Sequence, residues 1–476
     1  MKPAFVAAGV VVAVGAAYFG TAAVIGQKLE KNMRAMSAAA QAEWPQLRIT
    51  DERYDRSLFA ATHTFTLRVG CDAPDAAASA PKAAITIVEH IKIGPLPGFK
   101  ALGAATVDTE VAMDADTRKE VAKIFGTEQP IQAHTDVAFS GASHTHFSIA
   151  KFHETGPKGE QMDFQGLTGD VDNSDHVLEY DMRMPTLSVA DAASSATGLN
   201  MAIKGMHVHA RAEGTGDLAL RPSKSQGEVD AVELAMKAPG QDTAHKVAFS
   251  QFKFTQDTTV DKNLMNAVGH AEGLGQIDDT KLEKIELQAT MKRFNAIAYR
   301  DVMRHLVNSD PKTCGKAPDP AKLMASEEVQ AALMQVLAAN PELSLDKLVV
   351  QVDGKRAELA YAVGVEGFTA ADAKLPLTMG LMTRGYGNVK VKLPEDWVQK
   401  SLVYIAQQSG KESGGTDQAA LAEVMLGKVV DEGYVVREEG MLRSEAAYKG
   451  GRATINGKPL GRPAGGAGDN AVAAPM

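Results

Sequence analysis

Cysteine is nearly missing from this chain, which has only Cys71 and Cys314 among its 476 residues. The pair allows at most one disulfide, and the spacing cannot show whether the two thiols meet. Two free, buried thiols fit the sequence equally well. Basic residues are too few to balance the acidic ones, so the net charge is −9. That charge argues against a general nucleic-acid-binding protein.

Motifs of the common enzyme classes are absent as well. The chain has no G-x-x-x-x-G-K-[ST] phosphate loop, no H-E-x-x-H zinc motif and no G-x-S-x-G nucleophile motif. The Gly-rich segment 269–276 has the wrong spacing for a dinucleotide site and fits a loop better. We therefore expect no enzyme, no catalytic residue and no cofactor. The alternative is a hydrolase or metal-dependent enzyme whose site assembles from distant residues.

The one long apolar segment of the chain lies at its N-terminus. No charged side chain occurs in the 24 residues from Pro3 to Gly26, and a helix of this length spans roughly 36 Å, more than a hydrocarbon core of about 30 Å. A secretory signal usually has an apolar region of only about 7–15 residues. We therefore predict an uncleaved single-pass anchor over 1–27, with a cleaved signal or a soluble helix as alternatives. The helical pattern continues through a juxtamembrane segment, 28–45, until Pro45.

Apolar and polar residues alternate through most of the region 46–295. The clearest case is segment 177–184, which reads VLEYDMRM. Such alternation predicts antiparallel strands with one apolar and one wet face. The apolar phase includes Leu178, Tyr180, Met182 and Met184 on this segment, and Met206 and Val208 on a later one.

Three features interrupt this alternation. Glu89 stands in the apolar phase of an otherwise Ile-rich strand, and the phase slips between Phe249 and Phe252, which predicts a β-bulge. Short helices are predicted at 116–125 and 261–274. The region is otherwise expected to be one long succession of strands.

The region 296–460 has a different pattern, which predicts helices packed on an antiparallel sheet. An Asp-Gly pair at 353–354 predicts a hairpin, and so does the Asn456-Gly457 pair near the end. The tail 461–476 has too little apolar bulk to fold and is expected to be disordered. Helices are predicted at 295–310, 320–339, 393–408 (with Pro394 in the first turn and Trp397 buried) and 418–431, and closing strands at 434–438, 441–448 and 453–455. The fold class is therefore α+β and β-dominated.

Several segments resemble a known bacterial family. They are the apolar start running into IGQKLEKNM, YDRSLFAATHTFTL (54–67), VEHIKIGPLP (88–97) and the closing YKGGRATINGKPL (448–460). Together they resemble the YdgA family of bacterial envelope proteins, whose domain has no known function. Leu96 replaces an aromatic residue of the family pattern, and Ile93 replaces a histidine. The resemblance implies a periplasmic body on an inner-membrane anchor, whereas the flanking Lys and Arg residues alone would leave the body in the cytoplasm.

Two histidine pairs are the best metal candidates in the sequence. They are His144 and His146, with His153 nearby, and His207 and His209. Residues i and i+2 of a strand share a face, and His-x-His pairs can bind zinc. Both pairs occupy polar positions, and no Cys, Asp or Glu cluster accompanies them at ligand spacing. We therefore expect solvated strand positions and no metal site.

The function that these features favour is binding without catalysis. We expect a protein anchored in the bacterial inner membrane, with its body in the periplasm, that binds a lipid or an envelope protein on an extended β face. The apolar faces of the strands could line an open groove or form a sealed core, and the sequence leaves both possible. A further reading is a structural partner that contacts other anchored proteins through Leu29, Met33 and Met36.

Overall fold

The structure is a computed structural model, and it does not describe every residue. The predicted anchor 1–27, both cysteines and the tail 461–476 lie outside the described residues, as does the segment 28–45 apart from Arg34 and Ala38, which are helical. No helix of the described residues is both long and apolar enough to cross a membrane. The described residues are 47–57, 60–69, 83–93, 103–192, 198–215, 220–237, 243–307, 326–369, 371–375, 377–408 and 418–460, with positions 34, 38 and 97.

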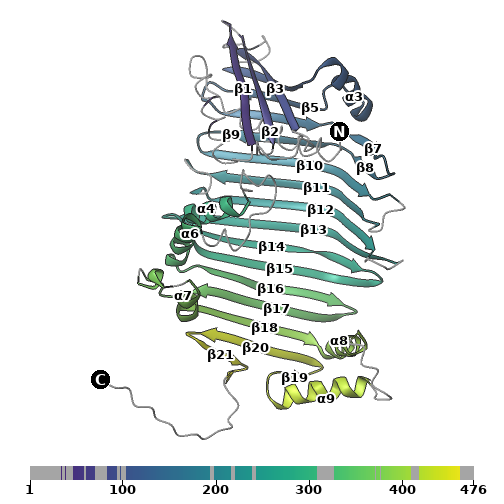
Figure 1. Cartoon of the computed structure of the whole chain (residues 1–476), viewed down its shortest axis with the longest axis vertical. Coiled ribbons are helices and arrows are strands. Elements are labelled where there is room, and N and C mark those ends of the chain that lie inside the picture. The colour runs from purple at the N-terminus through teal and green to yellow at the C-terminus, as the bar shows by residue number, and fades with distance from the viewer. Residues whose placement is uncertain are drawn as a thin grey trace.

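The fold is one antiparallel sheet that takes in 22 strands of the described part. Most strands pair with their neighbours in the chain, so the sheet grows as a long meander from β1 to β20 (Figure 1). The strands of its first part are β1 (Leu47–Arg56), β2 (Ala60–Val69), β3 (Ala83–Ile93), β4 (Ala105–Ala112), β5 (Ile131–Val137), β6 (Ser143–Ile149), β7 (Phe152–Thr155), β8 (Gln161–Phe164) and β9 (Leu167–Asn173).

Long strands form the middle of the sheet, and shorter ones close it. The middle strands are β10 (Val177–Ala190), β11 (Asn200–Glu213), β12 (Ser223–Lys237), β13 (Ala244–Asp261), β14 (Leu264–Ile277) and β15 (Thr280–Asn295). The later strands are β16 (Glu342–Val352), β17 (Lys355–Val365), β18 (Gly385–Pro394), β19 (Val436–Glu438), β20 (Met441–Lys449), β21 (Arg452–Ile455) and β22 (Lys458–Pro459). β15 pairs with β16, so the strands on both sides of residue 296 belong to the same sheet.

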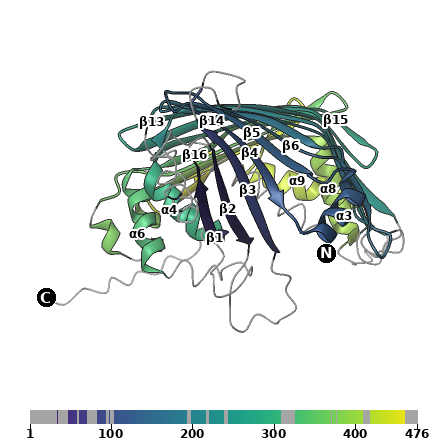
Figure 2. The same ribbon diagram turned by 90° about the horizontal axis from the view of Figure 1, so that it is seen from above.

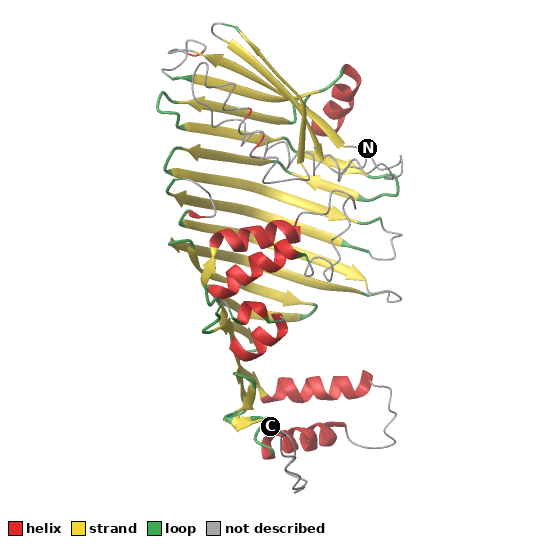
Figure 3. Cartoon of the chain, turned by 60° about the vertical axis from the view of Figure 1, so that its left-hand side comes forward, coloured by secondary structure: helices red, strands yellow, loops and turns green. Residues whose placement is uncertain are grey.

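The described helices all lie on one side of this sheet (Figures 2 and 3). Figure 2 shows the sheet arched, with β1–β3 crossing its concave side at the N-terminal end. The helices are α3 (Ala115–Phe125), α4 (Ala296–Val307), α6 (Glu327–Ala338), α7 (Leu377–Arg384), α8 (Glu395–Gln408) and α9 (Gln418–Asp431), with a short 3₁₀ turn, η3 (Asp372–Lys374). We call the concave side of the sheet the inner face and the convex side the outer face.

Buried apolar residues concentrate where β1–β3 cover the inner face. Phe65, Leu67 and Ile87, from β2 and β3, form one buried cluster with Met184 of β10. Leu187, Ile203 and Met206 pack against the same cluster, so these apolar side chains of β10 and β11 face inward. Two smaller buried clusters, around Ile91 and around Phe147, adjoin it. The N-terminal end of the arch is therefore a closed sandwich, which we call the cap.

The β-dominated α+β fold expected from the sequence is confirmed, and so are several local predictions. The expected bulge is present, because the β13–β14 register shifts between Ser250 and Lys253, and Gln251 has a φ of 52°. α3, α4 and α9 form where helices were predicted. The Asp-Gly hairpin also forms, with φ of 50° at Asp353 and 72° at Gly354.

Other predictions were wrong. Segment 261–274 is not a helix, and 269–276 is not a loop, because both belong largely to β14. Glycines are poor helix formers, and here they face bulky neighbours across the strands: a Cβ on Gly275 would come within 2.8 Å of Ile285 Cδ1. Pro394 ends β18 instead of starting α8, and Trp397 is only half-buried. The helix predicted from 320 begins at Glu327 within the described part, and α7 was not predicted.

The closing hairpin gives a first testable prediction. Asn456 and Gly457 have φ of 49° and 77°, as a tight turn between β21 and β22 requires. We expect Gly457→Val to lower the free energy of unfolding by about 1–3 kcal/mol, because a β-branched residue resists positive φ. Urea unfolding of the purified protein measures this loss, with Thr454→Val in the adjoining strand as the control. Equal loss in the two variants would contradict the prediction.

Candidate functional site

The inner face beyond the cap carries a continuous apolar surface from β12 to β18. Cross-strand partners point to the same side of a sheet, and the register places apolar residues opposite each other through this stretch. Val232 lies opposite both Ile203 and Phe249, and Leu287 lies opposite Leu348, which lies opposite Leu359. We call this surface the floor; its members include Val232, Leu234, Val247, Phe249, Phe252, Phe254, Ile285, Leu287, Leu343, Leu348, Leu359, Val363 and Val389.

The floor is open to a degree that a protein core is not. Across β12–β15 Thr258 is the one buried residue. Phe249 keeps 36 % of its surface exposed, Leu343 42 % and Val363 46 %. Fully buried core residues normally lose nearly all contact with water, so these side chains form a surface and not a core.

The sequence suggested that apolar residues of β10 and β11 could line an open groove. Most of them lie instead in or beside the cap. Met184 is buried in the cap, and Met206 packs against the same cluster. Leu178 and Met182 pack against the cluster around Phe147. Tyr180 of β10 is the exception, with 38 % of its surface exposed. Alternation alone identified the apolar phase correctly, but most of the predicted residues lie in or beside the cap and not on the floor.

A hollow on the floor lies beside α7, near the C-terminal end of the sheet. Its volume is about 490 Å³, which lies within the range of roughly 300–1,000 Å³ found for pockets that bury small ligands. Leu343, Val363, Gly387 and Tyr448 are successive cross-strand neighbours on β16, β17, β18 and β20, and they form its base together with Leu381 of α7.

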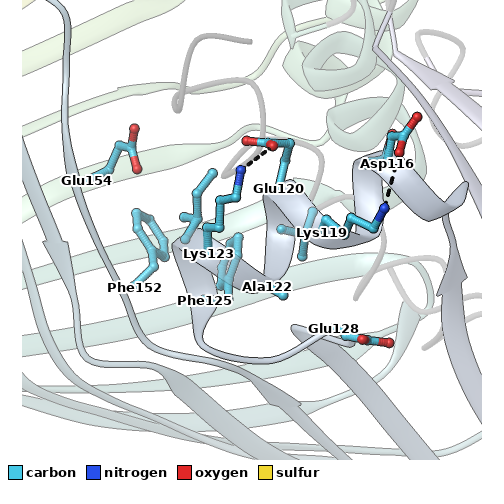
Figure 4. Close-up of a pocket in the computed structure, with 12 residues that line it drawn as sticks. Asp116, Lys119, Glu120, Ala122, Lys123, Phe125, Glu128, Phe152 and Glu154 are labelled. Atoms are coloured by element: carbon cyan, nitrogen blue, oxygen red, sulfur yellow. Dashed lines mark hydrogen bonds and ion pairs between the residues drawn. The ribbon is translucent and has the colours of Figure 1, made fainter.

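A larger hollow, of about 970 Å³, lies beside α3 at the cap (Figure 4). Phe125 and Phe152 lie side by side in its wall, with ring centroids 5.0 Å apart. The lysines of α3 that line it are neutralised by neighbours on the same helix, since Lys123 Nζ lies 2.6 Å from Glu120 Oε1. Lys119 Nζ lies 3.6 Å from Asp116 in the same way. The charged side chains that α3 contributes to this hollow therefore form ion pairs within the helix.

The histidine pairs lie on the outer face, each hydrogen-bonded to a carboxylate on the next strand. His144 Nδ1 lies 2.8 Å from Asp172 Oδ1, and His146 Nδ1 lies 2.9 Å from Asp170 Oδ1. His207 Nε2 lies 2.7 Å from Asp181 Oδ2, a residue that His209 also approaches. Within the described part of the chain, no group of three or more His, Cys, Asp or Glu residues is arranged to hold a metal ion.

A buried charged cluster inside the cap was not predicted. His63 of β2 is 1 % exposed and Glu89 of β3 is fully buried. His63 Nδ1 lies 2.9 Å from Glu89 Oε2, and His63 Nε2 lies 3.1 Å from Glu52 Oε1 of β1. A carboxylate can only accept hydrogen bonds, so both ring nitrogens donate when both glutamates are ionised. The imidazolium then links all three strands of the cap.

The pKa values of this cluster respond to opposing effects. Burial alone would lower the pKa of His63, but hydrogen bonds to Glu89 and Glu52 outweigh it, and the pKa is raised. Burial raises the pKa of Glu89, and the hydrogen bond from His63 opposes that shift only in part. Glu89 Oε1 and Thr109 Oγ1, on neighbouring strands, are buried without a hydrogen-bond partner in the described part of the structure. His63 and Glu89 are too deeply buried to contact a ligand, and the cluster links the three strands of the cap.

A signal for this cluster was present in the sequence. His63 shares the period-two phase of Phe65 and Leu67, and Glu89 shares the phase of Ile87 and Ile91. Two ionisable residues in the apolar phases of consecutive strands are expected to be neighbours if those strands pair. Both belong to the segments, 54–67 and 88–97, that carry the family resemblance.

Comparison with known proteins gives a family and nothing finer. Over residues 1–461 the chain matches a family described as bacterial protein of unknown function (DUF945). The comparisons with curated proteins and with solved structures returned no match. Because the family match spans nearly the whole chain, the protein belongs to this bacterial family of unknown function.

Proposed function

We propose that this protein binds the apolar part of a lipid on the floor of its arched sheet, without catalysing a reaction. The observation that carries the proposal is the apolar inner face of β12–β15, where Thr258 is the one buried residue. Large exposed apolar patches on monomeric proteins commonly mark binding sites. A sealed core would give the same sequence alternation but not these exposures.

The chemistry of the floor favours an acyl chain over a polypeptide strand. The floor consists of side chains on the face of a sheet whose backbone groups already pair between strands. A peptide lying extended across it would leave its own N–H and C=O groups without partners, at a cost of several kcal/mol for each group that is cut off from water. An acyl chain has no such groups, so its burial on the floor carries no polar penalty.

We further propose that the protein is a YdgA-like member of its family, with residues 1–27 as an anchor in the inner membrane and the body in the periplasm. The uncharged run from Pro3 to Gly26 supports an anchor. A lipid-binding body tethered to a membrane would stay close to its ligand, which raises the effective concentration of that ligand.

Lipid retention tests the proposed function. The full-length protein, purified in a mild detergent, is expected to retain phospholipid or fatty acid that mass spectrometry detects after organic extraction. We expect Phe249→Asp to reduce the retained amount strongly, because a carboxylate on the floor would have to be desolvated against the chain. Phe249 is 36 % exposed, so the variant should stay folded. Glu233→Gln on the outer face is the control, and equal retention by all three proteins would contradict the proposal.

A reporter fusion tests the orientation. A reporter that is active only in the periplasm, fused after Gly461, is expected to be active, because the proposed anchor would leave the body outside the cytoplasm. A second fusion with a reporter that is active only in the cytoplasm serves as the control. Activity of the cytoplasmic fusion alone would reverse the proposed orientation.

A further inference from the structure

We propose that the hollow beside α7 receives the methyl end of an unbranched acyl chain, and that Gly387 sets the length of chain the floor accepts. This inference rests on the proposed function and adds the ligand's orientation and a residue that determines specificity. The hollow is a defined site because four successive strands and α7 contribute to its lining.

The side chains at its base are apolar and accessible. Leu343 and Val363 keep 42 % and 46 % of their surfaces exposed, and Leu381 keeps 37 %. Phe294 of β15 adds an aromatic wall. Accessible apolar side chains on several sides give an alkyl chain more contacts than the rest of the floor does, and dispersion energy grows with the number of contacts.

The polar side-chain groups among the lining residues are already satisfied. Tyr448 Oη donates to Met382 O at 2.7 Å, and Tyr386 Oη donates to Glu342 Oε2 at 2.5 Å. Among the described residues that line the hollow there is no Lys, Arg, Asp, Glu or His. A charged or hydrogen-bonding head group placed here would lose its water and gain no partner, which is costly. The hollow therefore suits the hydrocarbon end of a lipid and excludes its polar end.

Gly387 gives the hollow its depth. A Cβ at this position would lie 3.5 Å from Val363 Cγ1 and 3.6 Å from Ala362 O, which are ordinary contact distances. A larger side chain at Gly387 would thus project beside Val363 without disturbing the backbone. Gly364 differs, because a Cβ there would come within 2.6 Å of Tyr386 Oη and 2.9 Å of Pro341 O. Gly387 is consequently the position at which the hollow can be filled while the sheet is kept.

The closed cap supports placing the end of the acyl chain in the hollow beside α7. At the opposite end of the inner face, Leu67 and Ile87 are each 1 % exposed, so side chains fill the interior of the sandwich that β2 and β3 form with the sheet. The accessible apolar surface lies between the cap and the hollow. A chain placed along it with its methyl end in the hollow has its polar end toward the middle of the sheet or its rim, where water is available.

The test uses the full-length protein and a palmitic acid analogue that carries a photoreactive diazirine at its methyl end. After irradiation, peptide mapping is expected to find the label on Leu343, Val363, Leu381 or Tyr448. Unlabelled saturated fatty acids of increasing length compete for the site. Their affinity should rise about fourfold per methylene, since each buried methylene contributes about 0.8 kcal/mol, up to a limiting length.

Gly387→Leu is expected to remove the label from the hollow and to shift the limiting length to shorter chains. Gly427→Leu on α9 is the control, because nothing lies within 4 Å of a Cβ at that position. Thermal melting of each variant checks that the protein remains folded. Gly387→Ala, which adds only the Cβ, should give an intermediate limit.

Several outcomes would overturn the inference. Labels elsewhere on the floor with none in the hollow, or an unchanged limiting length in folded Gly387→Leu, would refute it while leaving the proposed function in place. Labelling of the hollow by an analogue with its diazirine beside the carboxylate would reverse the orientation. A co-purified polypeptide cross-linked to the floor, or no label on any part of the protein, would overturn the proposed function as well.

Discussion

Replacing His63 with leucine is expected to lower the free energy of unfolding by about 3–5 kcal/mol, because it leaves Glu89 buried without its cationic partner. Glu89 is fully buried, and its contact with His63 Nδ1 is the one that offsets the cost of its charge. Chemical denaturation of the full-length protein measures the loss. His144→Leu is the matched control, since that side chain is 51 % exposed; exposed ion pairs contribute about 0–1 kcal/mol.

The double variant His63→Leu/Glu89→Leu separates a charge effect from a packing effect. Replacing both members of a buried ion pair with apolar residues is commonly neutral or stabilising, whereas removing one member is not. We therefore expect the double variant to recover most of the stability that His63→Leu loses. A double variant less stable than the single one would show that packing around the imidazole, and not the unpaired carboxylate, sets the cost.

The same variants carry a pH signature. The pKa of His63 is raised in the folded protein above its ordinary value of 6.5. The folded state therefore binds this proton more tightly than the unfolded state does, which stabilises the fold. The stabilisation is fully present below pH 6.5 and is lost as the pH rises through the folded-state pKa of His63. The pKa of Glu89 is also raised in the folded protein, above its ordinary value of 4.5. Its contribution to the free energy of unfolding therefore also decreases as the pH rises above 4.5. Wild-type stability should decline above neutrality more steeply than that of the double variant.

An aspartate substitution is expected to have opposite consequences at the two ends of the inner face. Leu67 in the cap is 1 % exposed, and Leu67→Asp should cost several kcal/mol because it buries an unpaired carboxylate. Leu343 on the floor is 42 % exposed, so Leu343→Asp can keep its charge in water and should cost about 1 kcal/mol or less. The same chemical change thus distinguishes a sealed core from an open surface.

Melting temperatures and urea midpoints of the two variants provide the measurement, with Leu67→Ala and Leu343→Ala as controls for lost apolar contact. The alanine variants report the loss of side-chain volume, and the difference between aspartate and alanine reports the charge. If Leu343→Asp unfolds the protein as Leu67→Asp does, the floor is a core and the proposed lipid site is wrong.

Local patterns in the sequence predicted much of the fold, because alternation, turns and bulges depend on near neighbours. The slip between Phe249 and Phe252 shows this well: both side chains face inward although three positions separate them, and the extra residue forms the predicted bulge. Asn456-Gly457 is a second case, in which the required φ values are encoded by two residues.

Features that depend on distant residues could not be predicted in the same way. Met184 and Phe249 both occupy apolar phases of long strands, but β1–β3 cover Met184 and not Phe249, which leaves exposures of 8 % and 36 %. The pattern of one strand carries no information about what lies above it. The hollow depends likewise on distant residues, because Leu343 of β16 and Tyr448 of β20 line it together.

The sequence predicted an apolar sheet face, but it did not predict which strands leave that face exposed. Alternation correctly indicated an apolar face, and Met182 was a reasonable member of it, but that residue packs against the cluster around Phe147. Glu89 stood out in the sequence as an exception within its apolar phase, whereas His63 was not singled out. Their contact required knowing that β2 pairs with β3 in the register that places these two residues opposite each other.

The near-sequential order of the strands in the sheet has a consequence for how the chain folds during its synthesis. The buried apolar clusters draw on residues from Ile49 to Met206, so the part with a sealed interior is synthesised first. From β10 to β18, each new strand pairs with the one made just before it. Contacts between chain neighbours form quickly, and early segments of a growing chain can fold before later ones exist. The completed cap then serves as a template on which the exposed apolar strands are laid down one at a time, which limits how long any of them stays unpaired during synthesis.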